Sequence, residues 1–332
     1  MLGVLCWGFL MVAYAPFAFG SENYSPLEVW GSPCISSVDY TNCSEANIDS
    51  QLRFPTALDI DSLGYVYVAD AWNDHIQKLD NSGMLVKKWG SPGTADGQFR
   101  FPAGLAVDSQ SNVYVADFGN SRIQKFTSDG KFITKWGSRG PDDGQFSRPQ
   151  GVAVDSQSNV YVADFGNSRI QKFTSDGKFI TKWGSRGSGD GQFGFGDQIV
   201  FTGPTDIAVD YQGNVYVTDL ANSRVQKFTS DGKFITKWGS RGSGDGEFFL
   251  PQGIATDFQG YVYVADSGND LIQKFDSSGL FITKVEPYFY SEGGGNPIFQ
   301  GPSGVAVNPR NSLVYLSDTW SDSIQIFYPS SQ

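Results

Sequence analysis

The sequence is poor in histidine and in sulfur-containing residues, and it has no excess of basic charge. It contains one histidine, His75, with three cysteines and three methionines, and its formal net charge is −11. A zinc centre usually needs about three protein ligands, which a single histidine cannot supply. Nucleic-acid-binding proteins usually carry a basic surface, so this charge balance argues against an RNA or DNA partner.

The one long apolar run lies at the N-terminus. Residues 1–20 contain no charged side chain and end in Ala18-Phe19-Gly20, a small-x-small pattern suited to signal peptidase. We therefore predict a signal peptide at 1–20, cleavage before Ser21, and an extracellular or cell-surface location. The run lacks the usual Lys or Arg and is long enough for an uncleaved anchor, which is the alternative and the one route to membrane contact.

Cleavage would remove one cysteine and leave Cys34 and Cys43 in an oxidising compartment. This even pair predicts a disulfide, which would stabilise the fold by about 2–3 kcal/mol through loop closure. Two free buried thiols are the alternative, although the segment around them is polar. Residues 23–25 and 42–44 match the short N-glycosylation triplet.

An internal repeat dominates the chain. Residues 106–140 recur unchanged as residues 153–187, and diverged copies lie on both sides. Each copy has four β-type runs, ending for example in Val-Tyr-Val-Ala-Asp or Lys-Trp-Gly, with turn residues between them. Four-stranded units repeated four to eight times predict an all-β propeller, in a single domain at 21–332. The aspartates that end the second run mark six blades: Asp70, Asp117, Asp164, Asp219, Asp266 and Asp318.

The repeat also predicts how the ring closes. The tryptophan of the fourth run lies 19 positions after the aspartate, as in Trp136, and for Asp318 this position falls beyond Gln332. An extra strand-like run at 27–31 precedes the first blade instead. We expect it to complete blade six and protect its edge, with an extended loop at 32–53 after it.

The units resemble NHL repeats, which form the propellers of tripartite-motif ubiquitin ligases, bacterial receptor-kinase sensor domains and the peptide-amidating lyase. The resemblance covers nearly all of the chain after residue 20 and implies a six-bladed propeller. It implies no activity, because one fold hosts many functions. RING and B-box cysteine and histidine clusters are missing from the sequence, and so are the histidines that hold zinc in the lyase.

Positions that recur in several or most blades are expected to serve the fold. Asn120 and Arg122, three and five positions after the blade-two aspartate, are expected to tie the loop between the second and third strands. Asp108, which ends the first strand, is expected to cap a hairpin turn rather than join an acidic ring. The tryptophan of the fourth run is expected to pack within the blades.

Positions where single blades depart from the pattern are the candidates for function. Trp72 of blade one and Trp320 of blade six stand where other blades have Gly or Ala, and His75 lies beside Trp72 in the sequence. Blades one and six are neighbours in a closed ring, so both tryptophans are expected on one face. Aromatic rims are typical of interfaces and sugar sites, although such rings also serve to pack under loops. The connection into blade six would add three more aromatic residues, Tyr288, Phe289 and Tyr290.

Two acids replace small residues near the axis. Asp59 takes the place of an alanine in blade one, and Asp206 takes the place of a glycine in blade four, across the ring. With backbone carbonyls they could hold a calcium ion, and solvated acids in a wet channel are the alternative.

These observations predict a secreted or cell-surface scaffold that binds a protein, peptide or glycan through the face of blades five, six and one. No Gly-x-Ser-x-Gly elbow or evident Ser-His-Asp triad occurs, so we assign no catalytic residue and no required cofactor. One alternative is a calcium-dependent hydrolase or lyase that uses Asp59 and Asp206 at the axial mouth. A purely structural role on the cell surface is another.

Overall fold

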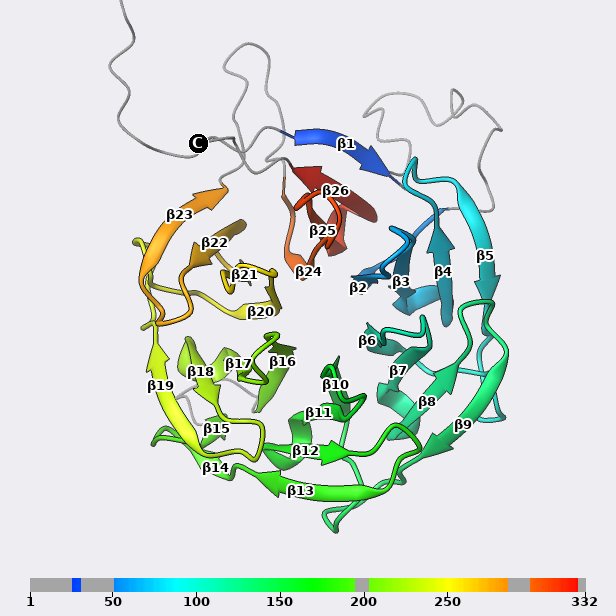
Figure 1. The fold of residues 1–332 in the computed structure, drawn as a ribbon, viewed down its shortest axis with the longest axis horizontal. Coiled ribbons are helices and arrows are strands. Elements are labelled where there is room, and N and C mark those ends of the chain that lie inside the picture. Colours follow the sequence, from blue (N-terminus) through cyan, green and yellow to red (C-terminus); the bar gives the residue numbers. More distant parts are fainter. Residues whose placement is uncertain (1–25, 31–50, 195–202, 286–298, 328–332) are drawn as a thin grey trace, which may run out of the picture.

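The computed structural model describes residues 26–30, 51–194, 203–285 and 299–327. They form six four-stranded antiparallel sheets set as blades around a central axis (Figure 1), which confirms the predicted six-bladed propeller. The predicted signal peptide, cysteine pair and glycosylation triplets, and Tyr288, Phe289 and Tyr290, lie outside the described residues and stay predictions. Within the described part of the chain, no helix combines the length and apolar character needed to cross a membrane.

The strands of each blade follow one another from the axis outward. The innermost strands all begin at a proline: β2 (Pro55–Ile60), β6 (Pro102–Val107), β10 (Pro149–Val154), β16 (Pro204–Val209), β20 (Pro251–Thr256) and β24 (Pro302–Val307). The second strands are buried along their whole length: β3 (Val66–Asp70), β7 (Val113–Asp117), β11 (Val160–Asp164), β17 (Val215–Asp219), β21 (Val262–Asp266) and β25 (Val314–Asp318).

The outer half of each blade repeats the same plan. The third strands are β4 (His75–Leu79), β8 (Arg122–Phe126), β12 (Arg169–Phe173), β18 (Arg224–Phe228), β22 (Leu271–Phe275) and β26 (Ser323–Phe327). The outer strands of blades one to five are β5 (Leu85–Trp89), β9 (Phe132–Trp136), β13 (Phe179–Trp183), β19 (Phe234–Trp238) and β23 (Phe281–Val285).

Short elements join these strands. One-turn 3-10 helices lie between the second and third strands of five blades: η2 (Ala71–Asn73), η3 (Phe118–Asn120), η4 (Phe165–Asn167), η5 (Leu220–Asn222) and η6 (Thr319–Ser321). A small parallel pair, β14 (Arg186–Gly187) and β15 (Phe193–Gly194), belongs to the connection from blade three to blade four.

The ring closes as the sequence predicts. Strand β1 (Pro26–Trp30) pairs antiparallel with β26 and completes the sheet β1-β26-β25-β24 (Figure 1). Trp30 is buried and takes the place that Trp136 has in its own blade, since both stand opposite the second residue of a third strand. Its ring lies against Gly83 of blade one, where a Cβ would come within 2.6 Å and where φ is +77°. Only glycine fits there, so blade six is locked to blade one.

The hydrophobic core lies between neighbouring blades. One cluster joins Tyr67 and Trp89 of blade one to Leu105 and Phe126 of blade two, and equivalent clusters follow around the ring. The predicted turn cap is confirmed at Asp108, whose Oδ1 accepts the backbone N–H groups of residues 110 and 112, at 2.9 and 2.8 Å. Each blade is thus stabilised by its neighbours.

Candidate functional site

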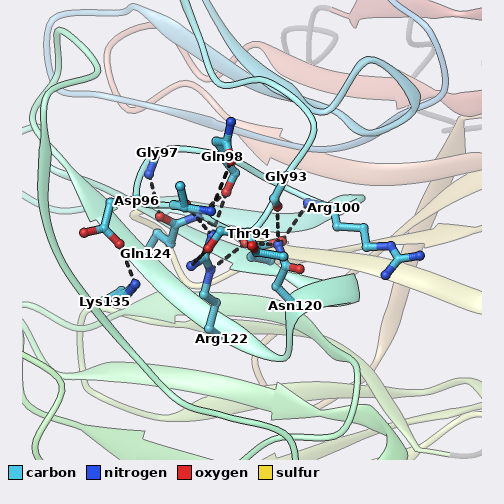
Figure 2. Close-up of polar contacts among 12 residues, drawn as sticks. Gly93, Thr94, Asp96, Gly97, Gln98, Arg100, Asn120, Arg122, Gln124 and Lys135 are labelled. Carbon is cyan, nitrogen blue, oxygen red and sulfur yellow. Dashed lines mark hydrogen bonds and ion pairs between the residues drawn. The ribbon is translucent and has the colours of Figure 1, made fainter.

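The arginine that stands five positions after the blade aspartate, in blades two to four, fixes the loops that join one blade to the next. Arg122 donates from Nε to Asp117 Oδ2 at 2.8 Å, and its two Nη atoms donate to the carbonyls of Thr94, Ala95 and Gln98 at 2.7, 2.8 and 2.8 Å. Figure 2 shows Arg122, Asn120 and Gln124 pointing into this loop. Arg122 thus contacts Asp117, the aspartate that ends the second strand and that we call the anchoring aspartate. The loop that Arg122 ties is not the predicted one between the second and third strands, because its carbonyls belong to the connection from the preceding blade. Arg169 and Arg224 make equivalent contacts.

Blades one, five and six replace this arginine with His75, Leu271 and Ser323. His75 Nε2 lies 2.8 Å from Asp70 Oδ2, and the side chain is 14% exposed. The histidine therefore belongs to the polar network of its own blade, whereas the prediction grouped it with the exposed aromatic residues.

The same three blades differ at the preceding position, a signal that the sequence analysis missed. Blades one, five and six carry Asp74, Asp270 and Asp322 there, where the other blades carry serine. Each aspartate accepts the backbone N–H of the residue before the first proline of the next blade. The N–H groups are those of Phe101 (2.6 Å), Gly301 (3.0 Å) and Phe54 (2.6 Å), in the same order.

The residues before these prolines have left-handed backbones. The φ angles are 56° at Phe54, 57° at Phe101, 55° at Arg148 and 55° at Leu250. A non-glycine residue in this region is strained, and such strain persists only where the surroundings enforce it. Arg148 and Leu250 adopt this backbone with serine at the aspartate position of the preceding blade, so the aspartates of blades one and six add a hydrogen bond to a backbone that the repeat itself imposes. Phe54 and Phe101 both line a cavity on the axis.

Phe54 is the centre of an aromatic group that we call the mouth cluster, consisting of Phe54, Trp72, Phe101, Phe118 and Trp320. Trp72 stacks on Phe54 with ring centroids 4.7 Å apart, and Trp320 meets Phe54 edge-on at 5.0 Å. Phe101 lies 6.1 Å from Phe54 and 5.7 Å from Phe118. Trp72 and Trp320 stay 50% and 64% exposed. The structure thus brings the two predicted tryptophans together, through a phenylalanine that the sequence analysis did not single out.

Two cavities follow the axis. The first, which we call the axial mouth, has a volume of about 200 Å³ and lies at the beginning of the innermost strands, on the side of the mouth cluster. The second, the lower channel, has a volume of about 240 Å³ and lies along the second half of those strands. The aromatic residues that line the axial mouth come from blades one and two, and its polar residues mostly from the other blades: Phe54 and Phe101, against Gln150, Thr205, Asp206, Gln252 and Ser303, with Thr56 from blade one.

The two predicted axial acids lie at different depths. Asp206 lines both cavities, whereas Asp59 lines the lower channel alone. Asp206 Oδ2 accepts the N–H of Ile254 at 3.1 Å, and Asp59 Oδ2 accepts that of Val107 at 2.7 Å, so each acid bridges to the next blade.

Burial perturbs both carboxyl groups. Desolvation raises the pKa of Asp206 to about 7 and that of Asp59 to about 6, while backbone N–H donors oppose the shift. Among the described residues, no three His, Cys, Asp or Glu side chains gather as a metal site. A calcium ion on the axis would therefore draw on these two acids and on backbone carbonyls. That site stays a prediction.

Comparisons with known proteins agree on the repeat and the fold. A family model of the NHL repeat matches residues 99–126 and 146–173, and a family model of a 6-bladed β-propeller matches residues 196–291. The chain is 46% identical over 61 residues to a peptidyl-glycine alpha-amidating monooxygenase of Mus musculus, and 44% identical over 61 residues to that of Rattus norvegicus. Each match covers 17% of this chain and 6% of the enzyme, so it spans a small part of those proteins.

Solved structures with the same fold include enzymes. Virginiamycin B lyase from Staphylococcus aureus has a TM-score of 0.56 at 15% identity, covering 82% of this chain and 94% of the lyase. A gluconolactonase from Xanthomonas campestris has a TM-score of 0.58 at 14% identity, covering 84% and 87%. A structural-genomics protein from Bacteroides thetaiotaomicron has a TM-score of 0.61 at 18% identity, covering 83% and 70%. At such low identity the likeness extends to the fold and not to the activity.

Proposed function

Because the chain is a six-bladed β-propeller built of NHL repeats, we propose that it is a non-catalytic, secreted or cell-surface scaffold that binds a peptide segment of a protein partner at its axial mouth. NHL-repeat propellers generally mediate protein interactions, which supports a protein partner over a glycan.

The mouth cluster is the observation that carries this proposal. Trp72 and Trp320 are half or more exposed, although large aromatic side chains are usually buried. Both rings contact Phe54, which continues into the axial mouth, so the exposed apolar surface leads directly into a cavity. Arg53 lies over Trp72, 5.2 Å from the ring centroid, and adds a cation at the edge. Clustered tryptophan and arginine beside a cavity are typical of binding hot spots.

The proposal is tested with peptides selected from a random display library on the purified protein. We expect the Trp72→Ala, Trp320→Ala double variant to bind the selected peptides at least ~10-fold more weakly, because aromatic anchors dominate binding energy. The matched control is Tyr211→Ala with Phe258→Ala. These rings are 68% and 60% exposed, and they lie in turns at the opposite end of the innermost strands. The proposal would be contradicted if wild type and the Trp72→Ala, Trp320→Ala variant bound the selected peptides with equal affinity. It would also be contradicted if the protein bound arrayed glycans and no peptide.

The alternative is a calcium-dependent hydrolase or lyase at the axial mouth. The observation in its favour is the pair of desolvated acids, Asp59 and Asp206, on the axis. Elemental mass spectrometry on protein purified without chelator tests it. About one calcium ion per chain, lost in both Asp59→Asn and Asp206→Asn, would support the enzyme over the scaffold.

A further inference from the structure

We propose that the axial mouth selects ligands in which an ammonium group stands next to an apolar group, and that Asp206 is the carboxylate that receives the ammonium. This inference rests on the proposed function and names the ligand chemistry of the same site. Lysine side chains and free peptide N-termini both carry this chemistry.

The walls of the axial mouth are divided by character. Phe54 and Phe101, from blades one and two, form an aromatic wall. The polar residues of the lining come mostly from the other blades: Gln150, Thr205, Gln252 and Ser303, with Thr56 from blade one. The hydroxyls of Thr205 and Ser303 donate to backbone carbonyls of the neighbouring blade, so the amide groups of the two glutamines supply the polar side. A ligand that is apolar at one end and polar at the other therefore matches the cavity better than a uniformly apolar one.

A hydroxyl network fixes the position of Asp206. Blade four has Thr218 where most blades have alanine before the anchoring aspartate. Its Oγ1 accepts the N–H of Asp206 at 3.0 Å, lies 2.9 Å from Thr205 Oγ1 and donates to the carbonyl of Gln252 at 2.6 Å. The backbone of Asp206 is thus tied to blades four and five, and its carboxylate is held in a defined place at the floor of the mouth.

Asp206 is partly exposed and lines the axial mouth, and its carboxylate lies close to the backbone of blade three. Gly151 stands opposite it, and a Cβ on that glycine would come within 2.4 Å of Asp206 Oδ1. Among the described residues, the backbone N–H groups of Ile254 and Ile207 donate to the carboxylate, whose two oxygens have the capacity to accept more hydrogen bonds than these two.

Basic side chains are missing from this environment. Of the described residues that line the axial mouth and the lower channel, none is lysine or arginine. A desolvated carboxylate without a cation is costly, and the pKa of Asp206, raised by burial to about 7, reflects that cost. An ammonium group bound at the mouth would supply the missing cation through a charge-assisted hydrogen bond.

The size of the cavity limits what enters. A volume of about 200 Å³ is below the usual range of sites for drug-sized ligands, which is roughly 300–1,000 Å³. The mouth therefore accepts one side chain or one chain terminus, and the rest of a partner would lie over Trp72 and Trp320.

The test compares phenethylamine with phenethyl alcohol, which share an aromatic ring and differ in the charged group, by titration calorimetry at pH 8. We expect phenethylamine to bind at least ~10-fold more tightly to wild type, and Asp206→Asn to remove this difference. Asp59→Asn is the matched control, because Asp59 lines the lower channel alone, and it should keep the difference. Thermal melting checks that both variants fold.

Equal binding of the two probes by wild type, a preference that persists in Asp206→Asn, or no binding of either probe would each overturn the inference. Phenylalanylglycinamide and Nα-acetyl-lysinamide then distinguish a peptide N-terminus from a lysine side chain as the source. The proposed function is judged separately. Library peptides whose binding depends on Trp72 and Trp320 but not on Asp206 would retain the scaffold and eliminate the ammonium site.

Discussion

Arg122, Arg169 and Arg224, with the aspartate and loop carbonyls that each contacts, form what we call the arginine clamp. Its contribution to the stability of the propeller can be measured at Arg169. Arg169 donates to Asp164 Oδ2 at 2.7 Å and to three loop carbonyls at 2.6–2.9 Å. The side chains of Arg169 and Asp164 are 8% and 0% exposed. Replacing Arg169 with Met keeps much of the volume but leaves a buried carboxylate without its cation. Removing one partner of a buried ion pair costs about 3–5 kcal/mol. We expect the lower end, because Asn167 and the Ser147 N–H still donate to Asp164.

Urea unfolding of wild type and Arg169→Met, analysed by linear extrapolation, measures this loss. The control is Lys182→Met, which breaks the exposed pair with Asp143. That pair is as short, at 2.6 Å, but its side chains are 44% and 52% exposed. An exposed pair contributes about 0–1 kcal/mol. Similar losses in the two variants would refute the reasoning, because they would show that burial does not decide the contribution of the pair.

The pH dependence of the same variant gives a second check. Burial raises the pKa of Asp164, and Arg169 opposes that shift. Without the arginine the folded-state pKa rises further above its unfolded value, so the native state binds the proton more tightly than the unfolded state. The free-energy difference between wild type and Arg169→Met should therefore shrink as the pH falls toward ~4.

Three further predictions concern closure, the axis and backbone strain. Trp30→Ala should cost about 3–5 kcal/mol in urea unfolding, because it empties a buried ring site at the closing strand, whereas the exposed Val29→Ala should cost little. Asp206→Asn should be more stable than wild type in thermal melts above pH 7, with the gain lost as the pH falls from about 7 to 3.8, because burial raises the carboxyl pKa across that window. Arg148→Gly should raise the free energy of unfolding by up to ~1 kcal/mol, because it relieves a φ of 55° at an exposed side chain. Arg100 is also exposed but has no positive φ, so Arg100→Gly should give no such gain.

The sequence predicted the blades, the ring closure and the turn caps because those features repeat at fixed spacing. Asp108 and its turn partners lie within a few residues of one another, so a single copy of the repeat contains the whole interaction. Phe54 could not be found in this way. Its partner Trp320 is distant in the sequence, its backbone before a proline is left-handed, and its N–H bonds to Asp322 of another blade. The carbonyls bound by Arg122 were also missed, because they belong to the connection from the preceding blade and lie 24–28 residues away in the sequence.

Blades two and three show where the molecule departs from its own symmetry. They are identical over residues 106–140 and 153–187, yet just before these stretches Phe101 corresponds to Arg148, and Ala103 corresponds to Gln150. Phe101, Ala103 and Gln150 all line the axial mouth.

A ring of identical blades would present identical groups around the axis, so its cavity could not have an aromatic side and a polar side. The differences at the mouth give the cavity an aromatic side and a polar side, while the repeated residues keep the frame unchanged. Exchanging Phe101→Arg and Ala103→Gln would give blade two the mouth residues of blade three without altering the arginine clamp. On this reasoning the double exchange should change ligand binding and leave the free energy of unfolding nearly unchanged. A clear loss of stability would show instead that Phe101 and Ala103 serve the fold.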